Sequence, residues 1–116
     1  MESCAGRLTI TRHPDGCLLL YPRPRWEAKI VELDALPYES RALRRLMIGH
    51  ALDLELDSAG RLLVPVGLRE DAKLARDATL LGSGSHFELW DPVLLREREE
   101  HDLADGLPAG AVGFRF

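Results

Sequence analysis

The stretch that most constrains the fold of this chain runs from Asp53 to Pro65. Residues 52 to 57 alternate leucine with acid, the two-residue period of a strand with one buried and one solvated face. Asp57 to Gly60 predicts a tight turn, because Asp favours the first turn position and Gly tolerates positive φ. Arg61 to Val64 is then expected to return as a second strand, which Pro65 ends. The sequence predicts a β-hairpin with Asp57 facing Arg61 across its turn.

The rest of the chain alternates short strands with helices, which predicts an α+β fold. Turn signals such as His13-Pro-Asp-Gly16 separate the strands, and Asp91-Pro92 is a typical helix start. The tail from Asp105 is rich in Gly, Pro and Ala, and we expect it to be loosely held. The expected strands cover residues 8–11, 17–21, 79–82 and 86–90, and the expected helices cover 26–36, 39–48, 68–75 and 91–101.

Two segments of the sequence resemble each other at a constant separation. Leu18, Leu20 and Tyr21 match Phe87, Leu89 and Trp90, and each pair is 69 positions apart (87 − 18, 89 − 20, 90 − 21). In both segments a turn leads to a strand, an aromatic residue, a proline and a helix, which indicates an internal duplication. We therefore expect an N-terminal half-repeat over residues 1–48, a C-terminal half-repeat over 49–104 and a flexible tail over 105–116. The first copy of the Asp57–Arg61 hairpin would fall before Met1, so one hairpin is expected to be missing.

Composition narrows the class of protein. The formal net charge is −4 over 116 residues, which argues mildly against a nucleic-acid binder, although arginines and lysine gather between residues 41 and 76. No apolar run approaches the roughly 20 residues that span a bilayer, and the N-terminus lacks the pattern of a signal peptide. Cys4 and Cys17 show no zinc-finger spacing and give no reason to infer a disulfide. We expect a soluble cytoplasmic protein without a cofactor or a metal.

Three segments together resemble one family. The segments 57–65 (DSAGRLLVP), 80–90 (LLGSGSHFELW) and 11–22 (TRHPDGCLLLYP) look like the bacterial MraZ proteins, and the resemblance extends to about His101. These are transcriptional regulators of the division and cell-wall gene cluster that share the swapped-hairpin fold of the AbrB group. The resemblance implies a duplicated, β-barrel-like core with surrounding helices. It also implies a homo-oligomeric ring, associated with the nucleoid, that presents hairpin arginines to direct repeats in double-stranded promoter DNA.

Arg61 and Asp57 can be carried over as motif positions for DNA binding. For Arg61 the alternative is an ion pair with Asp57 that only rigidifies the turn, and the two are compatible if Asp57 orients Arg61. Arg69 and Lys73 follow the hairpin directly and are further candidates for phosphate contact, as is Arg76. The arginines at positions 41, 44 and 45 are expected to lie on a solvated helix face.

No catalytic constellation is visible. Alternation along a strand already explains Asp53, Glu55 and Asp57, and the sequence around Ser83 and Ser85 lacks the pattern of a nucleophile elbow or a phosphate loop. We therefore predict that the chain is not an enzyme. The first hypothesis is a DNA-binding transcriptional regulator. The alternative is a protein-interaction or antitoxin-like scaffold that has lost DNA binding through truncation, and the acidic net charge favours it.

Overall fold

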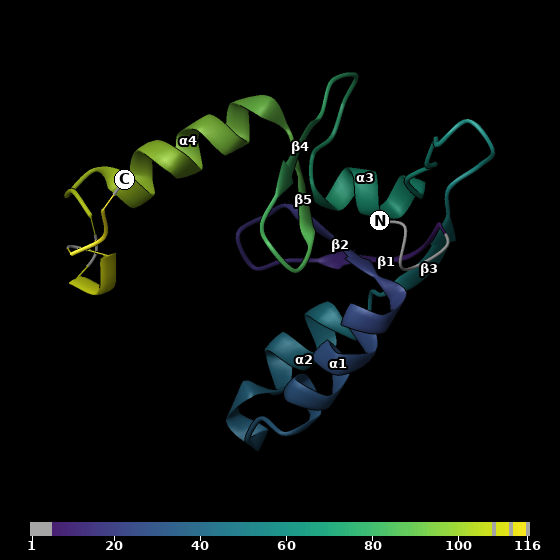
Figure 1. Cartoon of the computed structure of the whole chain (residues 1–116), viewed down its shortest axis with the longest axis horizontal. Helices are drawn as coiled ribbons and strands as arrows, with labels where there is room; N and C mark the ends of the chain where they lie inside the picture. The colour runs from purple at the N-terminus through teal and green to yellow at the C-terminus, as the bar shows by residue number, and fades with distance from the viewer. Residues whose placement is uncertain (1–5, 108, 112, 116) are drawn as a thin grey trace.

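A five-stranded antiparallel sheet organises the computed structural model, which describes residues 6–107, 109–111 and 113–115 (Figure 1). The strands lie in the order β3-β1-β2-β5-β4, so β3 and β4 are the two edges. Together with the helices, this confirms the α+β class. The strands are β1 (Arg7–Arg12), β2 (Leu18–Pro22), β3 (Leu52–Glu55), β4 (Thr79–Gly82) and β5 (Phe87–Trp90), and the helices are α1 (Arg23–Asp34), α2 (Arg41–Met47), α3 (Val66–Asp71) and α4 (Pro92–Leu103).

The central strand β2 is buried on both faces of the sheet. Leu18 and Leu20 face α3, where they join a cluster with Ile10 and Leu68. The alternate residues of the same segment, among them Leu19, pack with α1, α2 and the start of α4. This double cover explains the unbroken apolar run of β2, because a strand covered on one face only would alternate apolar with polar residues.

Helix α1 begins three residues before the predicted start at residue 26. Arg23 is its first residue and Pro24 lies within its first turn, where a missing N–H costs nothing. Proline therefore opens this helix and does not separate it from β2. The predicted helix over residues 39–48 is divided into a 3₁₀ turn, Tyr38–Ser40, and α2. Arg44 closes the connection, because its Nη1 donates to the carbonyl oxygens of Leu36 at 2.7 Å and Pro37 at 3.3 Å.

The two strand–helix segments that resembled each other in sequence occupy matching positions. Helices α1 and α4 each have 12 residues. Their first residues are 69 positions apart, and so are their last residues. Strands β2 and β5 pair antiparallel with Leu19 opposite Glu88, which are themselves 69 positions apart. An internal repeat with this offset would produce such a register around a local twofold axis. The boundaries of the two half-repeats stay a prediction.

The predicted return strand over residues 61–64 does not form. The Asp57 N–H donates to the Arg61 carbonyl at 2.9 Å across the turn, but residues 61–64 do not have strand geometry. The alternation persists, since Leu62 and Val64 pack on the core while Leu63 is 83% exposed. A two-stranded ribbon without further cover is only marginally stable, and this explains the difference.

The C-terminal residues follow α4 without joining the sheet (Figure 1). Their described part contains a short 3₁₀ turn, Ala109–Ala111, while Pro108, Val112 and Phe116 lie outside the described residues, as does Cys4. The predicted flexibility of this tail stays a prediction. None of the helices in the described part of the chain is long and apolar enough to cross a membrane.

Candidate nucleic-acid interface

The loop at residues 57–61 is organised by one carboxylate. Asp57 Oδ1 accepts hydrogen bonds from the backbone N–H groups of Ala59 at 2.9 Å and Arg61 at 2.7 Å. The main-chain carbonyl of Asp57 accepts a hydrogen bond from the Gly60 N–H at 2.9 Å, and Gly60 has a φ of +79°. Only glycine adopts this φ readily, so residue type and position agree with a tight turn. The loop is thus held by hydrogen bonds to Asp57.

The same carboxylate orients the Arg61 side chain. Asp57 Oδ2 accepts from Arg61 Nε at 2.9 Å, and the Arg61 side chain is 80% exposed. Hydrogen bonds from the Arg61 backbone, its side chain and the Ala59 backbone hold the pKa of Asp57 below its ordinary value. Within the described residues, the two terminal nitrogens of the guanidinium have no partner. Arg61 therefore presents the edge that can bind a phosphate or a guanine bidentately.

The chain leaves helix α3 in an uncommon way, at Lys73, two residues after its last residue Asp71. The Leu74 N–H donates to the Arg69 carbonyl at 2.9 Å and the Lys73 N–H donates to the Glu70 carbonyl at 3.0 Å, the pair of bonds that defines a Schellman motif. Lys73 takes the left-handed conformation that glycine normally supplies, with a φ of +56°. Of the two candidate residues, Arg69 therefore lies in the last turn of one short helix and Lys73 directly follows its C-cap, and both are exposed.

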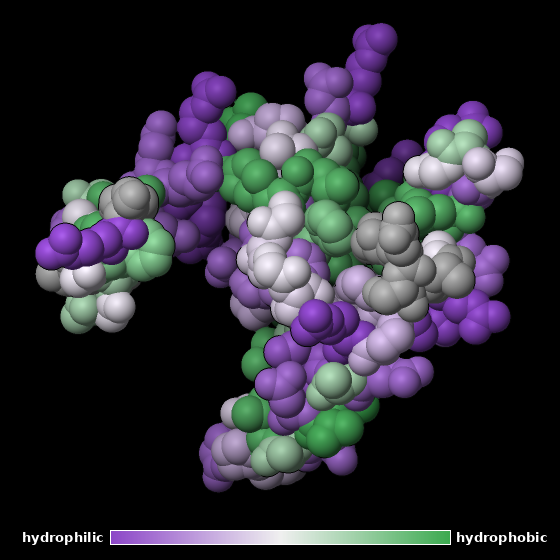
Figure 2. Space-filling view, viewed as in Figure 1, coloured by the Kyte–Doolittle hydropathy of each residue, from purple (hydrophilic) through white to green (hydrophobic). Residues whose placement is uncertain are grey.

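The structure separates the basic candidates into groups. The loop after β3 and the connection from α3 to β4 project as two protrusions on the side of the sheet that carries α3, whereas α2 lies on the opposite side (Figure 1). Figure 2 shows hydrophilic side chains on both protrusions. The arginines of α2 therefore belong to another surface. Arg44 in particular already donates a hydrogen bond to the Leu36 carbonyl in the connection between α1 and α2.

Two ion pairs that the sequence did not suggest join elements next to this region. Arg12, the last residue of β1, lies 3.6 Å from Asp71 at the end of α3. Arg23 Nε lies 3.5 Å from Asp53 Oδ1 on β3. Both pairs join residues far apart in the sequence, so no local pattern could have revealed them. The first pair joins α3 to β1, and the second joins α1 to β3, the strand that leads into the loop at residues 57–61.

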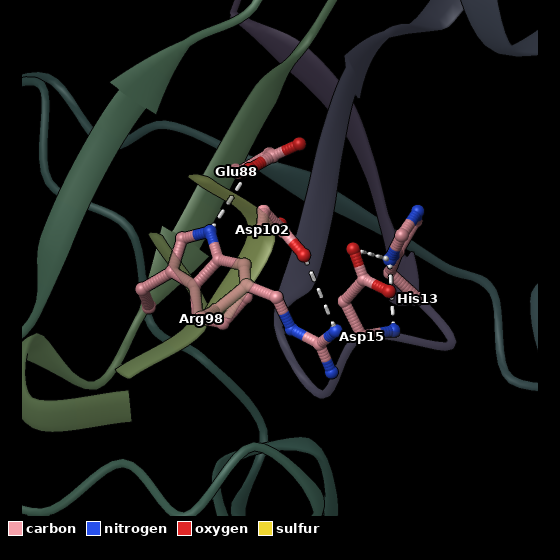
Figure 3. A network of polar contacts seen from close by, with 6 residues as sticks. His13, Asp15, Glu88, Arg98 and Asp102 are labelled. Atoms are coloured by element: carbon pink, nitrogen blue, oxygen red, sulfur yellow. Dashed lines mark hydrogen bonds and ion pairs between the residues drawn. The ribbon is translucent and has the colours of Figure 1, made fainter. Parts of the chain in front are cut away.

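A second polar cluster lies where the two strand–helix segments meet (Figure 3). There the indole N–H of Trp90 donates to Glu88 Oε1 at 2.9 Å, His13 Nδ1 lies 3.7 Å from Asp15, and Arg98 lies 3.6 Å from Asp102. His13 Nδ1 also accepts a hydrogen bond from the Asp15 backbone N–H at 3.0 Å, so these contacts join residues that are close together in the chain. Among the described residues, no group of three or more His, Cys, Asp or Glu side chains could hold a metal ion.

Comparisons with known proteins assign the class. The sequence profile of the MraZ family, described as "MraZ protein, putative antitoxin-like", matches residues 47–105. A protein of Bordetella pertussis named Transcriptional regulator MraZ is 53% identical over 116 residues, which covers 100% of this chain and 82% of that protein. A protein of Burkholderia cenocepacia with the same name is 49% identical over 111 residues, covering 96% of this chain and 78% of that protein.

The chain belongs to the MraZ family. This confirms the family expected from the three sequence segments. Since MraZ proteins are transcriptional regulators, the family also confirms that the chain is not an enzyme. The profile match includes the loop at residues 57–61, α3 and the connection to β4, so the candidate contacts lie in the part of the chain that the family shares.

Proposed function

We propose that this chain is a transcriptional regulator that binds double-stranded DNA through the loop at residues 57–61. The observation that carries the proposal is the exposed side chain of Arg61, which Asp57 holds at a protruding loop through Nε. Arginine in this state loses little side-chain freedom on binding, because one of its hydrogen bonds is already formed. Contact with a guanine edge would supply specificity, whereas contact with phosphate would supply affinity.

Fluorescence anisotropy on a promoter fragment with tandem direct repeats tests this role. Arg61→Ala should weaken binding about tenfold to a hundredfold if Arg61 makes a bidentate contact with a base. Arg45→Ala is a matched control, since it removes an exposed arginine from α2 on the opposite side of the sheet. Equal affinity of wild type and Arg61→Ala for the repeats would contradict the proposal.

Asp57 acts in this proposal as a positioning residue. Asp57→Asn keeps an oxygen that can accept from the backbone but removes the negative charge that orients Arg61. We therefore expect weaker discrimination between repeat and random DNA, with a salt dependence close to that of wild type. Loss of the salt dependence itself would show that Asp57 supports the whole loop and does not position Arg61.

Arg69 and Lys73 are proposed as phosphate contacts. Each contact that is lost should reduce the slope of log affinity against log salt by about 0.9. Lys73→Gly separates charge from backbone, because glycine suits the φ of +56° and should stabilise the fold by about 0.5–1 kcal/mol while the salt slope falls. An unchanged salt slope for Lys73→Gly would show that Lys73 makes no phosphate contact.

The finer proposal concerns assembly and targets. A net charge of −4 gives a single chain little general affinity for DNA. A homo-oligomeric ring would place several loops on successive repeats, and avidity would then supply the affinity that one chain lacks. We propose the promoter of the division and cell-wall gene cluster as the target, a cytoplasmic, nucleoid-associated location, and two half-repeats over residues 1–48 and 49–104.

The alternative is a protein-interaction or antitoxin-like scaffold without DNA binding. The observation that favours it is the separation of the basic residues on two protrusions, beside acidic side chains on β3 such as Asp53 and Glu55, which are 66% and 74% exposed. Binding that shows no preference for repeats at low salt would support the scaffold.

A further inference from the structure

A pocket of about 380 Å³ lies on the face of the sheet that carries α1 and α2. Its apolar wall comes from β2, the two helices and the connection between them, and consists of Leu19, Leu33, Leu36, Leu43 and Met47. A pocket of this size with a mainly apolar wall and a few polar groups is typical of small-molecule sites. Leucine and methionine side chains suit a flexible aliphatic ligand, because methionine adapts its shape to what it contacts.

One polar side chain of this pocket is buried and has an unpaired hydroxyl. Tyr21 lines the pocket and is 3% exposed. Its ring stacks on His86 at a centroid distance of 4.8 Å and packs on Trp26 at 5.5 Å. Within the described residues, however, the Tyr21 hydroxyl makes no hydrogen bond. A buried tyrosine usually pairs its hydroxyl, since an unsatisfied buried donor lowers stability. The pocket therefore contains a donor that a ligand can satisfy.

The charge around this hydroxyl indicates the sign of the ligand. Burial raises the pKa of Tyr21, so the hydroxyl stays protonated and can donate, and Lys29 is near enough to oppose that rise. Lys29 Nζ lies 2.9 Å from Glu32, and an ammonium has two more donors. His13 and His86 complete the polar rim. Among the described residues that line the pocket, three nitrogen bases thus face one carboxylate, which Lys29 already pairs.

We propose that this pocket binds a small aliphatic carboxylic acid, of the class of the medium-chain fatty acids, in its ionised form. The carboxylate accepts hydrogen bonds from the Tyr21 hydroxyl and from Lys29 Nζ. The hydrocarbon chain lies between the helices, against Leu36, Leu43 and Met47. The inference does not depend on DNA binding.

The polar groups favour a carboxylate over other ligands with the same hydrocarbon chain. A carboxylate oxygen accepts from a hydroxyl and from an ammonium at once, and hydrogen bonds to an ionised group are about twice as strong as neutral ones. An alcohol could pair with the Tyr21 hydroxyl but would gain little from the charge of Lys29. An ammonium ligand would meet that charge as a repulsion.

Methionine methyl NMR on the full chain, without DNA, tests the proposal. Met47 is 6% exposed and lines the pocket, and the chain has only two methionines, so the variant Met47→Leu assigns its signal. Octanoate is the probe, and octan-1-ol and octylamine are controls with the same chain length. Octanoate should shift the Met47 signal saturably. Octan-1-ol should bind about tenfold more weakly, because it lacks the charged hydrogen bonds, and octylamine should bind more weakly still.

Tyr21→Phe tests the donor without changing the ring. It should weaken octanoate binding about tenfold, the effect of one lost hydrogen bond to a charged group. Since the hydroxyl makes no hydrogen bond within the described residues, urea unfolding should show no loss of stability in this variant. A merely structural role of Tyr21 would give the opposite result, with lower stability and unchanged affinity.

Lys29→Gln tests the charge. It should weaken octanoate binding about fivefold. Arg25→Gln is the matched control, because it removes one positive charge from an exposed position of the same helix that does not line the pocket. It should leave the affinity unchanged.

Three results would overturn the proposal. The first is no saturable shift of the Met47 signal with octanoate, and the second is equal affinity for octanoate and either control ligand. The third is a Met47 signal that moves with protein concentration in the absence of octanoate, because a second copy of the chain would then occupy the pocket.

Discussion

The first hairpin and its helix, residues 7–34, differ from the second, residues 79–103, mainly in what covers them. The helices have equal length and the central strands pair across a local twofold relation. In the first segment, β3 pairs with the outer strand β1 and α2 packs beside α1. Trp26 and Leu33 of α1 are therefore buried. In the second segment, the outer strand β4 is an edge of the described sheet, and α4 has no buried residue. Similar local sequences thus give similar elements, while burial depends on neighbours.

The largest expected effect comes from matched deletions on the two outer strands. Ile10 is fully buried, so Ile10→Ala should reduce the free energy of unfolding by about 3 kcal/mol. Leu80, its counterpart, is 54% exposed, so Leu80→Ala should reduce it by less than about 1 kcal/mol. Urea unfolding at one protein concentration measures both. Equal losses would mean that the β4 edge is covered in solution.

A smaller effect is expected at the start of α4. The Leu94 N–H donates to Asp91 Oδ2 at 3.1 Å, whereas α1 follows Pro22 without a side-chain cap. Since α4 is stabilised by little burial, Asp91→Ala should lower the free energy of unfolding by about 1 kcal/mol and reduce the helix content. Circular dichroism with urea titration measures both quantities. Pro22→Ala is the control at the equivalent position of α1, and a larger loss there would reverse the comparison.

The smallest effect is a pH dependence at the junction of the two segments. His86, from the second, stacks on Tyr21 of the first at a centroid distance of 4.8 Å. Burial lowers the pKa of His86, with smaller contributions from Glu88, which raises it, and from Lys29 and His13, which lower it. The unfolded chain therefore takes up the proton first as pH falls through about 6.5, and folding stability should fall with it.

His86→Phe keeps an aromatic ring against Tyr21 but cannot titrate. Unfolding free energies between pH 5 and pH 7.5 should therefore depend less on pH in this variant than in wild type. The same slope in both proteins would assign the dependence to another group.

Local patterns in the sequence predicted much of this fold. The turn at Asp57–Gly60, strand β4 and the Asp91 cap all follow from residues close to one another in the chain. The strand predicted over residues 61–64 was wrong because a strand needs a partner, and alternation cannot show whether one is present. The same limit applies to Leu52, which lies on the predicted buried side of its strand yet is 46% exposed.

The candidate site was predicted in part. The contact between Asp57 and Arg61 follows from their spacing, and the structure forms it. The left-handed conformation of Lys73 could not be predicted, because lysine rarely adopts it and the hydrogen bonds that impose it come from the end of α3. DNA contact by Arg61, Asp57, Arg69 and Lys73 stays a prediction.

The pairing of Leu19 with Glu88 has a consequence for how such a protein can change. In a homodimer, a residue on the twofold axis meets its own copy, so every substitution there occurs twice. Here the two partners are separate positions of one chain: Leu19 is buried in the core, while Glu88 accepts from the Trp90 indole. The residues at positions 19 and 88 can therefore be substituted independently of each other. A covalent link between two similar strand–helix segments permits asymmetry at the one place where a symmetric assembly forbids it.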